Sequence, residues 1–413
     1  MRAAARRGER DRTWTRGAKL RWRIGLFLQG VRLARRTARA AQAQSGKSIP
    51  VQAREIIALR PLRLGPREYY KYRLFDESRC SPEQRREYVG KRFEDVFRIV
   101  NDPGLLAVSN VSGSWEGKVD KILFDCLMRA ANVPTPPIIA LFDTTGASYY
   151  GVPSLRSSEA LEQFVRGRAD SGFFAKPARA HRGEGAVAVA RIENGDASFP
   201  DGTRHPLGEL LATIAAHKRV VFQERLVPHP QLQAIWGTTI GTVRVIVLRR
   251  QRGSRIHRTV LRIPVGTGIT DNFGVDGRSG VLIGWVEPAT GRLLRVVAGR
   301  GVDQRLVDRH PDTGASLAEL VLPDWEEGVA LVERASQTLV AMPVQAWDLA
   351  LTDRGPVIVE VNDMSGQNIL QLAGPPGLLD RELCDFLRER GLEWPYPHAA
   401  AAAPEPRVVQ ARA

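Results

Sequence analysis

The pattern of apolar and polar residues near the C-terminus predicts two short strands joined by a tight turn. The segment from Val344 to Leu351 is largely apolar with Asp348 in its middle, the turn has the sequence DRG, and Pro356 to Val361 form a second apolar run. Glu360 falls near the end of that run, and Asn362 follows it. Because side chains alternate along a strand, Glu360 and Asn362 are expected on one face, and strand pairing brings Asp348 to that face.

The rest of the chain predicts both helices and strands. Apolar residues recur at helical spacing in Pro82 to Ile99, Gly117 to Ala131, Ser157 to Val165, Leu207 to His217, Asp324 to Met342 and Gly377 to Arg390. Short apolar runs predict strands at Ile138 to Phe142, Phe173 to Lys176, Ala186 to Ile192, Val220 to Leu226, Gly241 to Arg250 and Arg258 to Gly266, and a hairpin over Val281 to Leu294. The Gly-containing polar segments 177–185 and 267–280 are expected to be loops.

Composition places the chain among globular proteins and confines its excess charge to one end. The 413 residues are 43% hydrophobic and 25% charged, with a net charge of +15. Residues 1–40 hold thirteen Arg and Lys against two acids, a net charge of +11, so the remaining residues hold only +4. This distribution argues against a body that binds nucleic acid specifically, because such binding requires an extended basic surface.

Cysteine usage and hydropathy indicate a reducing cytoplasmic location. Cys80, Cys126 and Cys384 are far apart and form no CxxC pair, so they predict neither a disulfide framework nor a zinc site. No apolar run approaches the length of about 20 residues that a membrane span needs. The basic N-terminus lacks the apolar core and cleavage site of a signal peptide.

The basic arm contains an amphipathic pattern. Between Ala18 and Ala40, apolar residues including Leu20, Phe27 and Val31 recur at helical spacing, and arginines lie towards the other side. A basic amphipathic helix of this kind could contact an anionic membrane surface weakly, at the inner face of the cell membrane. A helix packed on its own domain and a basic tail without a partner are the alternatives.

The predicted C-terminal hairpin carries a candidate metal site. Asp348, Glu360 and Asn362 would present hard oxygen ligands from rigid strands, which suits Mg²⁺ held together with the phosphates of a nucleotide. A carboxylate at the end of a buried strand is costly without a partner. The alternative is a surface hairpin whose acids are solvated.

Two further segments have features of a nucleotide site. Lys176 ends an apolar strand just before a loop with Gly183 and Gly185, where backbone amides could approach phosphate oxygens. The run from Phe222 to Val227 joins an apolar strand to a polar break, where backbone groups could contact adenine. Taken alone, a glycine loop more often only turns the chain, and such a strand is more often part of the core. Lys121, near the start of a helix, is by itself an ordinary surface lysine.

Taken in order, these segments resemble the ATP-grasp superfamily. The resemblance is carried by a helix opening with Asp120 and Lys121, the run NVPTPP, the run FFAKPARAHRGEG, the strand VFQERLV and the ending formed by Asp348, Glu360 and Asn362. The segments TVRVIVL and TDNFGVDGRSG are similar to those of the sugar-transfer-associated group, which is related to alpha-L-glutamate ligases. The resemblance covers roughly residues 110–392. Residues 42–110 show no glycine-rich Rossmann-like subdomain, which departs from the usual pattern.

The resemblance implies a fold and a set of site residues. It implies an α+β ATP-grasp fold, in which two α+β subdomains clasp ATP, preceded here by a helical N-terminal region. The implied contacts with ATP are Lys121 and Lys176 on the phosphates, the lid residues Arg182, Gly183 and Gly185, and the adenine-side residues Gln223, Glu224, Arg225, Leu226 and Val227. Asp348, Glu360 and Asn362 would hold Mg²⁺, and Arg244 and Asn272 are the candidate catalytic residues. A structural role for Arg244 and a metal or loop-capping role for Asp271 are open alternatives.

The implied activity is that of an ADP-forming carboxylate ligase. ATP would phosphorylate a small-molecule carboxylate, and an amine or glycan acceptor would then attack the acyl-phosphate, in the modification of a cell-surface polysaccharide or its precursor. A kinase-like phosphotransferase and a degenerate ATP-binding scaffold of a polysaccharide assembly are the alternatives. The expected organisation is a basic arm (1–40), a mostly helical region (41–110), an ATP-grasp domain (111–392) and a disordered tail (393–413).

Overall fold

The computed structural model describes most of the chain between residues 34 and 393. The described residues are 34–90, 93, 96–97, 100–101, 120–146, 148–149, 151–179, 185–200, 202–250, 253–266, 281–339, 342–362, 366–374, 377–393 and 407–408. Most of the predicted arm lies outside them, as do the predicted site residues Arg182, Gly183 and Asn272. None of the described helices is long and apolar enough to cross a membrane.

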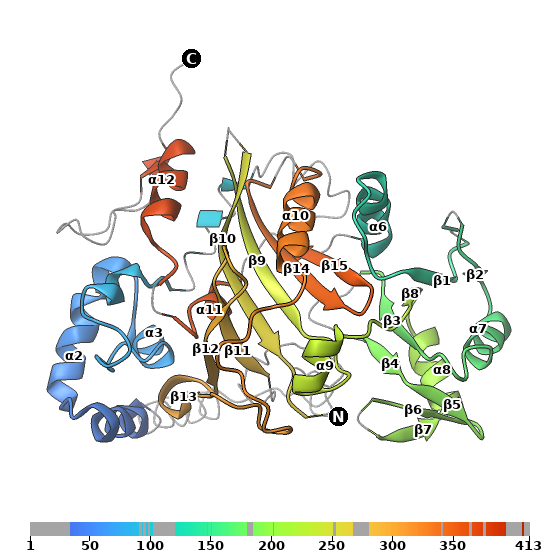
Figure 1. Cartoon of the computed structure of the whole chain (residues 1–413), viewed down its shortest axis with the longest axis horizontal. Coiled ribbons are helices and arrows are strands. Elements are labelled where there is room, and N and C mark those ends of the chain that lie inside the picture. The colour runs from blue at the N-terminus through green and yellow to red at the C-terminus, as the bar shows by residue number, and fades with distance from the viewer. Residues whose placement is uncertain are drawn as a thin grey trace, which may run out of the picture.

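A five-stranded sheet forms one side of the molecule, drawn in green at the right of Figure 1. Its order is β2-β1-β8-β3-β4, and its strands are β1 (Ile138–Asp143), β2 (Ser154–Leu155), β3 (Phe173–Pro177), β4 (Val187–Val189) and β8 (Arg219–Gln223). Helices α7 (Ser158–Arg166) and α8 (Leu207–Ala215) share a core with this sheet through Leu161, Val165, Leu210 and Ile214. A three-stranded sheet of β5 (Arg191–Glu193), β6 (Asp196–Ser198) and β7 (Arg204–Pro206) lies beside it.

A seven-stranded antiparallel sheet forms the centre. Its order is β13-β12-β11-β10-β9-β14-β15, and its strands are β9 (Thr242–Arg250), β10 (Gly253–Ile263), β11 (Leu282–Val286), β12 (Leu293–Ala298), β13 (Arg305–Leu306), β14 (Val344–Thr352) and β15 (Gly355–Asn362). The nine residues of β14 are all buried, which fits its position between two other strands with both faces covered.

Different helices cover the two faces of the central sheet. One face packs against α6 (Lys121–Ala130), α9 (Pro230–Trp236) and α10 (Trp325–Ser336). The other packs against α3 (Pro66–Lys71), α11 (Gln367–Leu370), α12 (Arg381–Glu389) and the segment around Leu59, next to α2 (Ile49–Ala58). We call this second face the N-terminal face, because most of its cover comes from residues before 101. The short 3₁₀ helices are Arg60–Leu62, Gln84–Glu87 and Gly301–Asp303.

The N-terminal region is joined to the central sheet by side chains that bond to backbone. The amide of Asn101 donates to Val344 O at 3.1 Å, and its oxygen accepts from Val344 N at 2.8 Å. The oxygen of the Gln371 side chain likewise accepts from Val89 N at 2.9 Å, and its amide donates to Val89 O at 3.1 Å. A Cβ added to Gly377 would stand 2.2 Å from the carbonyl carbon of Glu87, so only glycine allows this approach. The region before residue 101 therefore packs directly against the central sheet and the segment that follows it.

The beginning of the described chain also packs on the body. Residues 34–45 are helical. Ala38 and Ala41 are buried, and the side chain of Gln52 donates to Ala38 O at 3.0 Å. At the other end, Arg407–Val408 (β17) pair with Leu392–Glu393 (β16).

The predicted strands are confirmed. The helix predicted over Pro82 to Ile99 is wrong in its first half: Gln84–Glu87 form only a 3₁₀ helix, and the chain is extended at Tyr88, where the backbone of the next residue, Val89, bonds to the side chain of Gln371. Other helices differ at their ends. The expected strand from Ala186 to Ile192 is divided into β4 and β5. The helix expected to reach Met342 ends at Ser336, where Thr338 caps the last turn by donating to Ala335 O at 2.7 Å. Helix α9 was not predicted, because the sequence VPHP was interpreted only as a break. In the structure Pro230 begins a helix, a position that needs no N–H donor.

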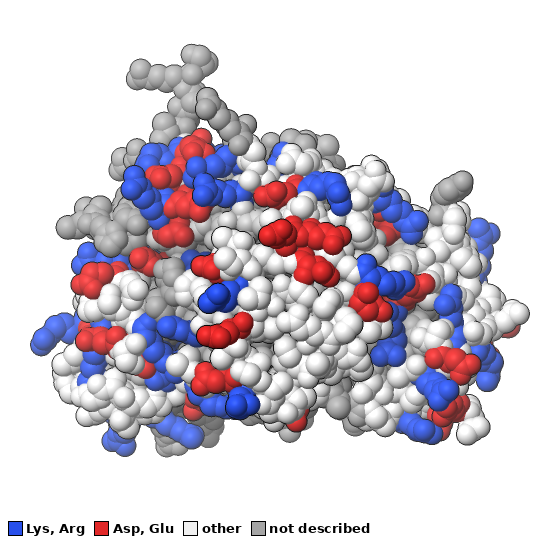
Figure 2. Space-filling view, in the orientation of Figure 1, with Lys and Arg blue, Asp and Glu red and all other residues white. Residues whose placement is uncertain are grey.

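Charged side chains are mixed on the face shown in Figure 2. Lysines and arginines lie among acidic residues over both the N-terminal helices and the five-stranded sheet.

Candidate nucleotide and metal site

The C-terminal hairpin forms as predicted and brings its two acids together. In β14 and β15, Asp348 and Glu360 lie opposite one another in the antiparallel register. The amide of Asn362 donates to Glu360 Oε1 at 3.3 Å. All three predicted metal ligands therefore lie at one end of the hairpin.

Asp348 is held by two arginines from neighbouring strands. Arg244 lies directly opposite Asp348 in β9, and its Nε and Nη2 donate to the two carboxylate oxygens, Nη2 at 3.0 Å. Arg262 Nη2 from β10 lies 2.8 Å from Asp348 Oδ2. Burial alone would raise the pKa of Asp348, but the two guanidinium groups hold it at about 2. Asp348 is thus ionised at neutral pH although it is 2% exposed.

Glu360 has the opposite electrostatic balance. Burial and the negative charge of Asp348 raise the pKa of Glu360, while Lys176 and Arg244 act against this shift. The amide of Asn362 supplies no charge. The Glu360 carboxylate therefore becomes fully ionised at a smaller cost when a further cation lies beside it.

Two lysines, one in strand β3 and one at the start of helix α6, interact with Glu360. Lys176 lies in β3, Lys121 begins α6, and Lys121 N donates to Ala178 O at 3.3 Å just after β3. Burial lowers the pKa of both lysines, that of Lys176 to about 8, and the charge of Glu360 opposes the shift in both. Lys121 further lowers the pKa of Lys176. The two ammonium groups therefore interact with each other and with the carboxylate of the hairpin.

Helix α6 is held at its start and at its middle, which positions Lys121. Asp120 caps the helix by accepting from Ile122 N at 3.0 Å. In the middle of the helix, the buried carboxylate of Asp125 accepts from Thr135 Oγ1 at 2.5 Å and from the hydroxyl of Tyr149. These bonds join the helix to the chain on either side of β1.

The predicted adenine segment connects the two sheets. Gln223 and Glu224 are tied to the run NVPTPP, because the Gln223 amide donates to Pro136 O at 3.1 Å and Glu224 N donates to Pro137 O at 3.0 Å. Val227 O accepts from Asp353 N at 3.1 Å in the hairpin turn. These three groups have partners within the protein, and contact of the segment with adenine stays a prediction.

The other residues of this segment lie nearer the surface. Glu224 pairs with Arg354 at 3.1 Å, and both side chains are largely exposed. Arg225 is partly buried, which lowers its pKa, Leu226 is partly buried, and Val227 is 42% exposed.

Of the predicted lid residues Arg182, Gly183 and Gly185, the structure describes Gly185. Gly185 has φ of +71°, and a Cβ there would stand 2.9 Å from His217 Nε2, so glycine is required for this turn. The other lid residues, Arg182 and Gly183, lie outside the described residues, as do the predicted catalytic residue Asn272 and the neighbouring Asp271.

Arg262 was not predicted as a site residue. It lies on the same face of β10 as Val260, which is opposite Arg244, and its Nη2 also donates to Thr242 Oγ1. The available signal was an arginine within the apolar run TVLRIP, next to a strand that already held Arg244.

The donor set fits Mg²⁺. Two carboxylates and one amide lie together, and these are hard oxygen ligands. Glu360 has a raised pKa, which a divalent cation would reverse. No group of three or more His, Cys, Asp or Glu residues suited to a metal occurs among the described residues.

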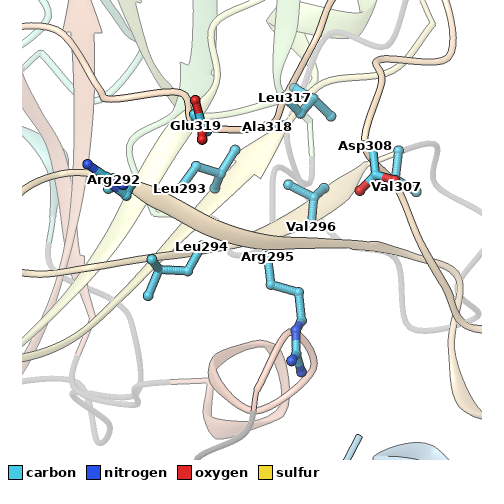
Figure 3. Close-up of a pocket in the computed structure, with 10 residues that line it drawn as sticks. All are labelled: Arg292, Leu293, Leu294, Arg295, Val296, Val307, Asp308, Leu317, Ala318 and Glu319. Carbon is cyan, nitrogen blue, oxygen red and sulfur yellow. The ribbon is translucent and has the colours of Figure 1, made fainter. Parts of the chain in front are cut away.

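A separate cavity of about 300 Å³ lies away from this cluster (Figure 3). It is lined by β12 and by residues between Val307 and Glu319, including Leu293, Val296 and Leu317 of the core on the α10 side of the sheet. In Figure 3, Arg295 points away from the cavity, and it donates to Gly374 O at 2.8 Å. The cavity therefore belongs to the opposite face of the sheet from Asp348.

Comparison with known proteins gives one family match. A family model described as sugar-transfer associated ATP-grasp matches residues 116–385. No curated protein matches the chain.

Solved structures with a similar fold are distant in sequence. The VanG D-Ala:D-Ser ligase from Enterococcus faecalis is 13% identical, with 66% of this chain and 57% of that chain covered and a TM-score of 0.33. The D-alanyl-alanine synthetase A from Vibrio cholerae is 14% identical, with 66% and 65% covered and a TM-score of 0.36. The D-alanine–D-alanine ligase from Bacillus anthracis is 11% identical, with 65% and 66% covered and a TM-score of 0.34. The matched part of this chain thus spans less than two thirds of each of these proteins.

Proposed function

The chain belongs to the sugar-transfer associated ATP-grasp family, and from this premise we propose that it is an ATP- and Mg²⁺-dependent ligase that activates a carboxylate as an acyl-phosphate. The observation that carries the proposal is the convergence of Lys121 of α6 and Lys176 of β3 with Glu360 and the Arg244–Asp348 pair of the central sheet. Cations and hard oxygen donors at one place are what phosphoryl transfer requires.

The two lysines, the hairpin residues and Arg244 would each have a separate task. Lys121 and Lys176 would bind the phosphates of ATP. Glu360 and Asn362, with Asp348 beside them, would hold Mg²⁺, which neutralises charge on the triphosphate. Arg244, fixed by Asp348, would stabilise the charge of the transferring phosphoryl group.

The proposed reaction has two balanced steps. A substrate carboxylate oxygen attacks the γ-phosphorus of ATP, the bond to the bridging oxygen breaks, and ADP leaves. An amine then attacks the acyl carbon, inorganic phosphate leaves, and the amine loses a proton to give an amide. A closed lid over residues 178–185 would keep water from the acyl-phosphate.

The cellular role rests on the family description alone. We propose that the acceptor belongs to a cell-surface glycan or its precursor, and that the protein acts in the cytoplasm. A kinase-like phosphotransferase and an inactive scaffold are the competing functions, and the presence of both lysines and all three oxygen donors argues against the scaffold.

Release of ADP and trapping with hydroxylamine separate these functions. Purified protein with Mg-ATP is screened against amino acids combined with sugar nucleotides or lipid-linked sugars. ADP release that depends on the substrates, together with a hydroxamate formed when hydroxylamine replaces the acceptor, supports the ligase. ADP release without hydroxamate supports the kinase, and no ADP release with any combination contradicts both.

A further inference from the structure

The N-terminal region reaches the edge of the proposed site through helix α3. Tyr69 and Tyr72, near the end of this helix, are both buried, and Tyr69 donates to Glu55 Oε2 at 2.5 Å. The turn at Gly301 packs against the helix, because a Cβ added to Gly301 would stand 3.9 Å from the Cα of Lys71. Lys71 therefore extends from a backbone that is fixed on several sides, as a binding residue requires.

Lys71 and Tyr72 converge on one residue of the segment that follows the metal ligands. Lys71 Nζ donates to Asn368 Oδ1, and the hydroxyl of Tyr72 donates to the same oxygen at 3.1 Å. Asn368 lies in α11, six residues after Asn362. This contact joins positions 297 residues apart in the chain.

Asn368 lies close to the catalytic arginine. A Cβ added to Gly366 would stand 3.5 Å from Arg244 Nη1. Gly366 and Asn368 are two residues apart, a backbone separation of no more than about 7 Å. Asn368 therefore belongs to the segment that packs beside Arg244, and it holds the ammonium of Lys71 at this segment.

Lys71 and the phosphate-binding lysines approach from opposite sides. In Figure 1, α3 lies to the left of β9 and β14, whereas β3, which carries Lys176, lies to their right. In phosphoryl transfer the attacking oxygen and the leaving ADP are roughly in line. A group on the α3 side of Arg244 thus faces the non-nucleotide substrates.

We propose that Lys71, positioned by Asn368, binds an anionic group, a carboxylate or a phosphate, on a non-nucleotide substrate. The inference rests on the proposed ligase function for the identity of the site. Lys71 lies outside residues 116–385, so the family match does not assign it. An ammonium is a suitable point charge for either anion, and the N-terminal region thereby forms the wall of the substrate site.

Chemical protection tests the anion site without a known substrate. The full-length protein is loaded with Mg²⁺ and a non-hydrolysable ATP analogue, and acetylation of Lys71 by acetic anhydride is followed by mass spectrometry. The exposed Lys218 serves as the internal reference. Inorganic phosphate and glutarate are added separately, and at least one should slow acetylation of Lys71 several-fold without affecting Lys218. An unchanged rate with both probes overturns the proposal.

Two variants separate binding from a structural role. Lys71→Gln removes the charge. Asn368→Asp strengthens the contact with Lys71 but places a fixed anion where the substrate anion would lie. Both should raise the KM of the non-nucleotide substrate about tenfold to a hundredfold and leave the KM for ATP unchanged. Arg67→Gln, an exposed change on the same helix, is the control and should behave as wild type. Wild-type kinetics in Asn368→Asp would show that the contact is only structural.

Hydroxylamine identifies which substrate carries the anion. If the nucleophile carries it, Lys71→Gln should form hydroxamate at the wild-type rate and lose only the reaction with the natural acceptor. If the carboxylate substrate carries it, hydroxamate formation should fall as well. Protection of Lys71 without any hydroxamate from the wild type would contradict the ligase function and leave the anion site standing.

Discussion

Arg244 in β9 and Asp348 in β14 lie directly opposite one another in adjacent antiparallel strands, and the guanidinium donates to both carboxylate oxygens. Both side chains are buried, so the pair depends on its own complementarity rather than on water. It also fixes the orientation of the arginine next to the carboxylate of Glu360.

Arg244→Gln should destabilise the protein by about 3 kcal/mol, because it leaves a buried carboxylate with one of its two arginines. Urea unfolding at neutral pH measures this change. A double-mutant cycle with Asp348→Asn should give a coupling energy of about 2 kcal/mol. If the losses in free energy of unfolding of the two single variants simply add in the double variant, the pair does not contribute to stability as a unit.

Glu360→Gln should abolish turnover while the protein stays folded. The substitution keeps the shape and removes the charge that would hold Mg²⁺, so ATP binding should weaken much more with Mg²⁺ than without it. Calorimetric titration with and without Mg²⁺ measures the difference. Asp353→Asn, an exposed change in the turn of the same hairpin, is the matched control and should be nearly silent. Wild-type turnover in Glu360→Gln would refute both the metal site and the ligase function.

ATP affinity should decrease as pH rises above about 8. Burial lowers the pKa of Lys176 from 10.5 to about 8, so its charge is lost above that pH in the free protein. The affinity should fall by up to about tenfold per pH unit in this range, since binding then requires uptake of a proton. Lys176→Arg, which keeps its charge, should remove the inflection.

The same pKa shift predicts the effect of Lys176 on stability. The folded-state pKa lies below the unfolded value, so burying the charged lysine costs free energy below pH 8 and this cost is relieved as the pH rises towards 10.5. The contribution of Lys176 to the free energy of unfolding therefore increases with pH in this window, which a comparison of unfolding curves with Lys176→Met would show.

Asp125→Ala should destabilise the protein by about 2 kcal/mol, because it removes the bonds that this buried carboxylate accepts from Arg129, Thr135 and Tyr149. Thermal unfolding measures the loss, and ATP binding should weaken as well because α6 carries Lys121. Glu162→Ala removes the exposed pair with Arg166 and should cost no more than about 0.5 kcal/mol. Equal costs for the two variants would contradict the role of Asp125.

The basic arm should bind anionic vesicles weakly through its charge and apolar residues. A variant that lacks residues 1–33 tests this contact. The deletion stops at residue 33 because Ala38 and Ala41 are buried in the body. The truncated protein should bind ATP as the full chain does and lose the preference for anionic over neutral vesicles in sedimentation assays. A full-length protein without that preference would refute the contact.

The sequence by itself determined the elements and the order of the motifs. Apolar runs of strand length, the DRG turn and the Asp120 cap act over a few residues, so the hairpin at 344–362 and helix α6 could be predicted from local pattern. The ordered motifs were also enough to indicate the family that the match over residues 116–385 confirms.

Only the tertiary structure decided which charges meet. That Arg244 pairs with Asp348 could not be predicted from its strand, because the pairing depends on the register that places the two residues opposite one another. Arg262 and Lys71 came from segments with no motif, and their contacts with Asp348 and Asn368 join positions more than 80 residues apart in the chain. Such contacts cannot be predicted from local sequence. They form only when the strands pair in register and the N-terminal region packs on the sheet.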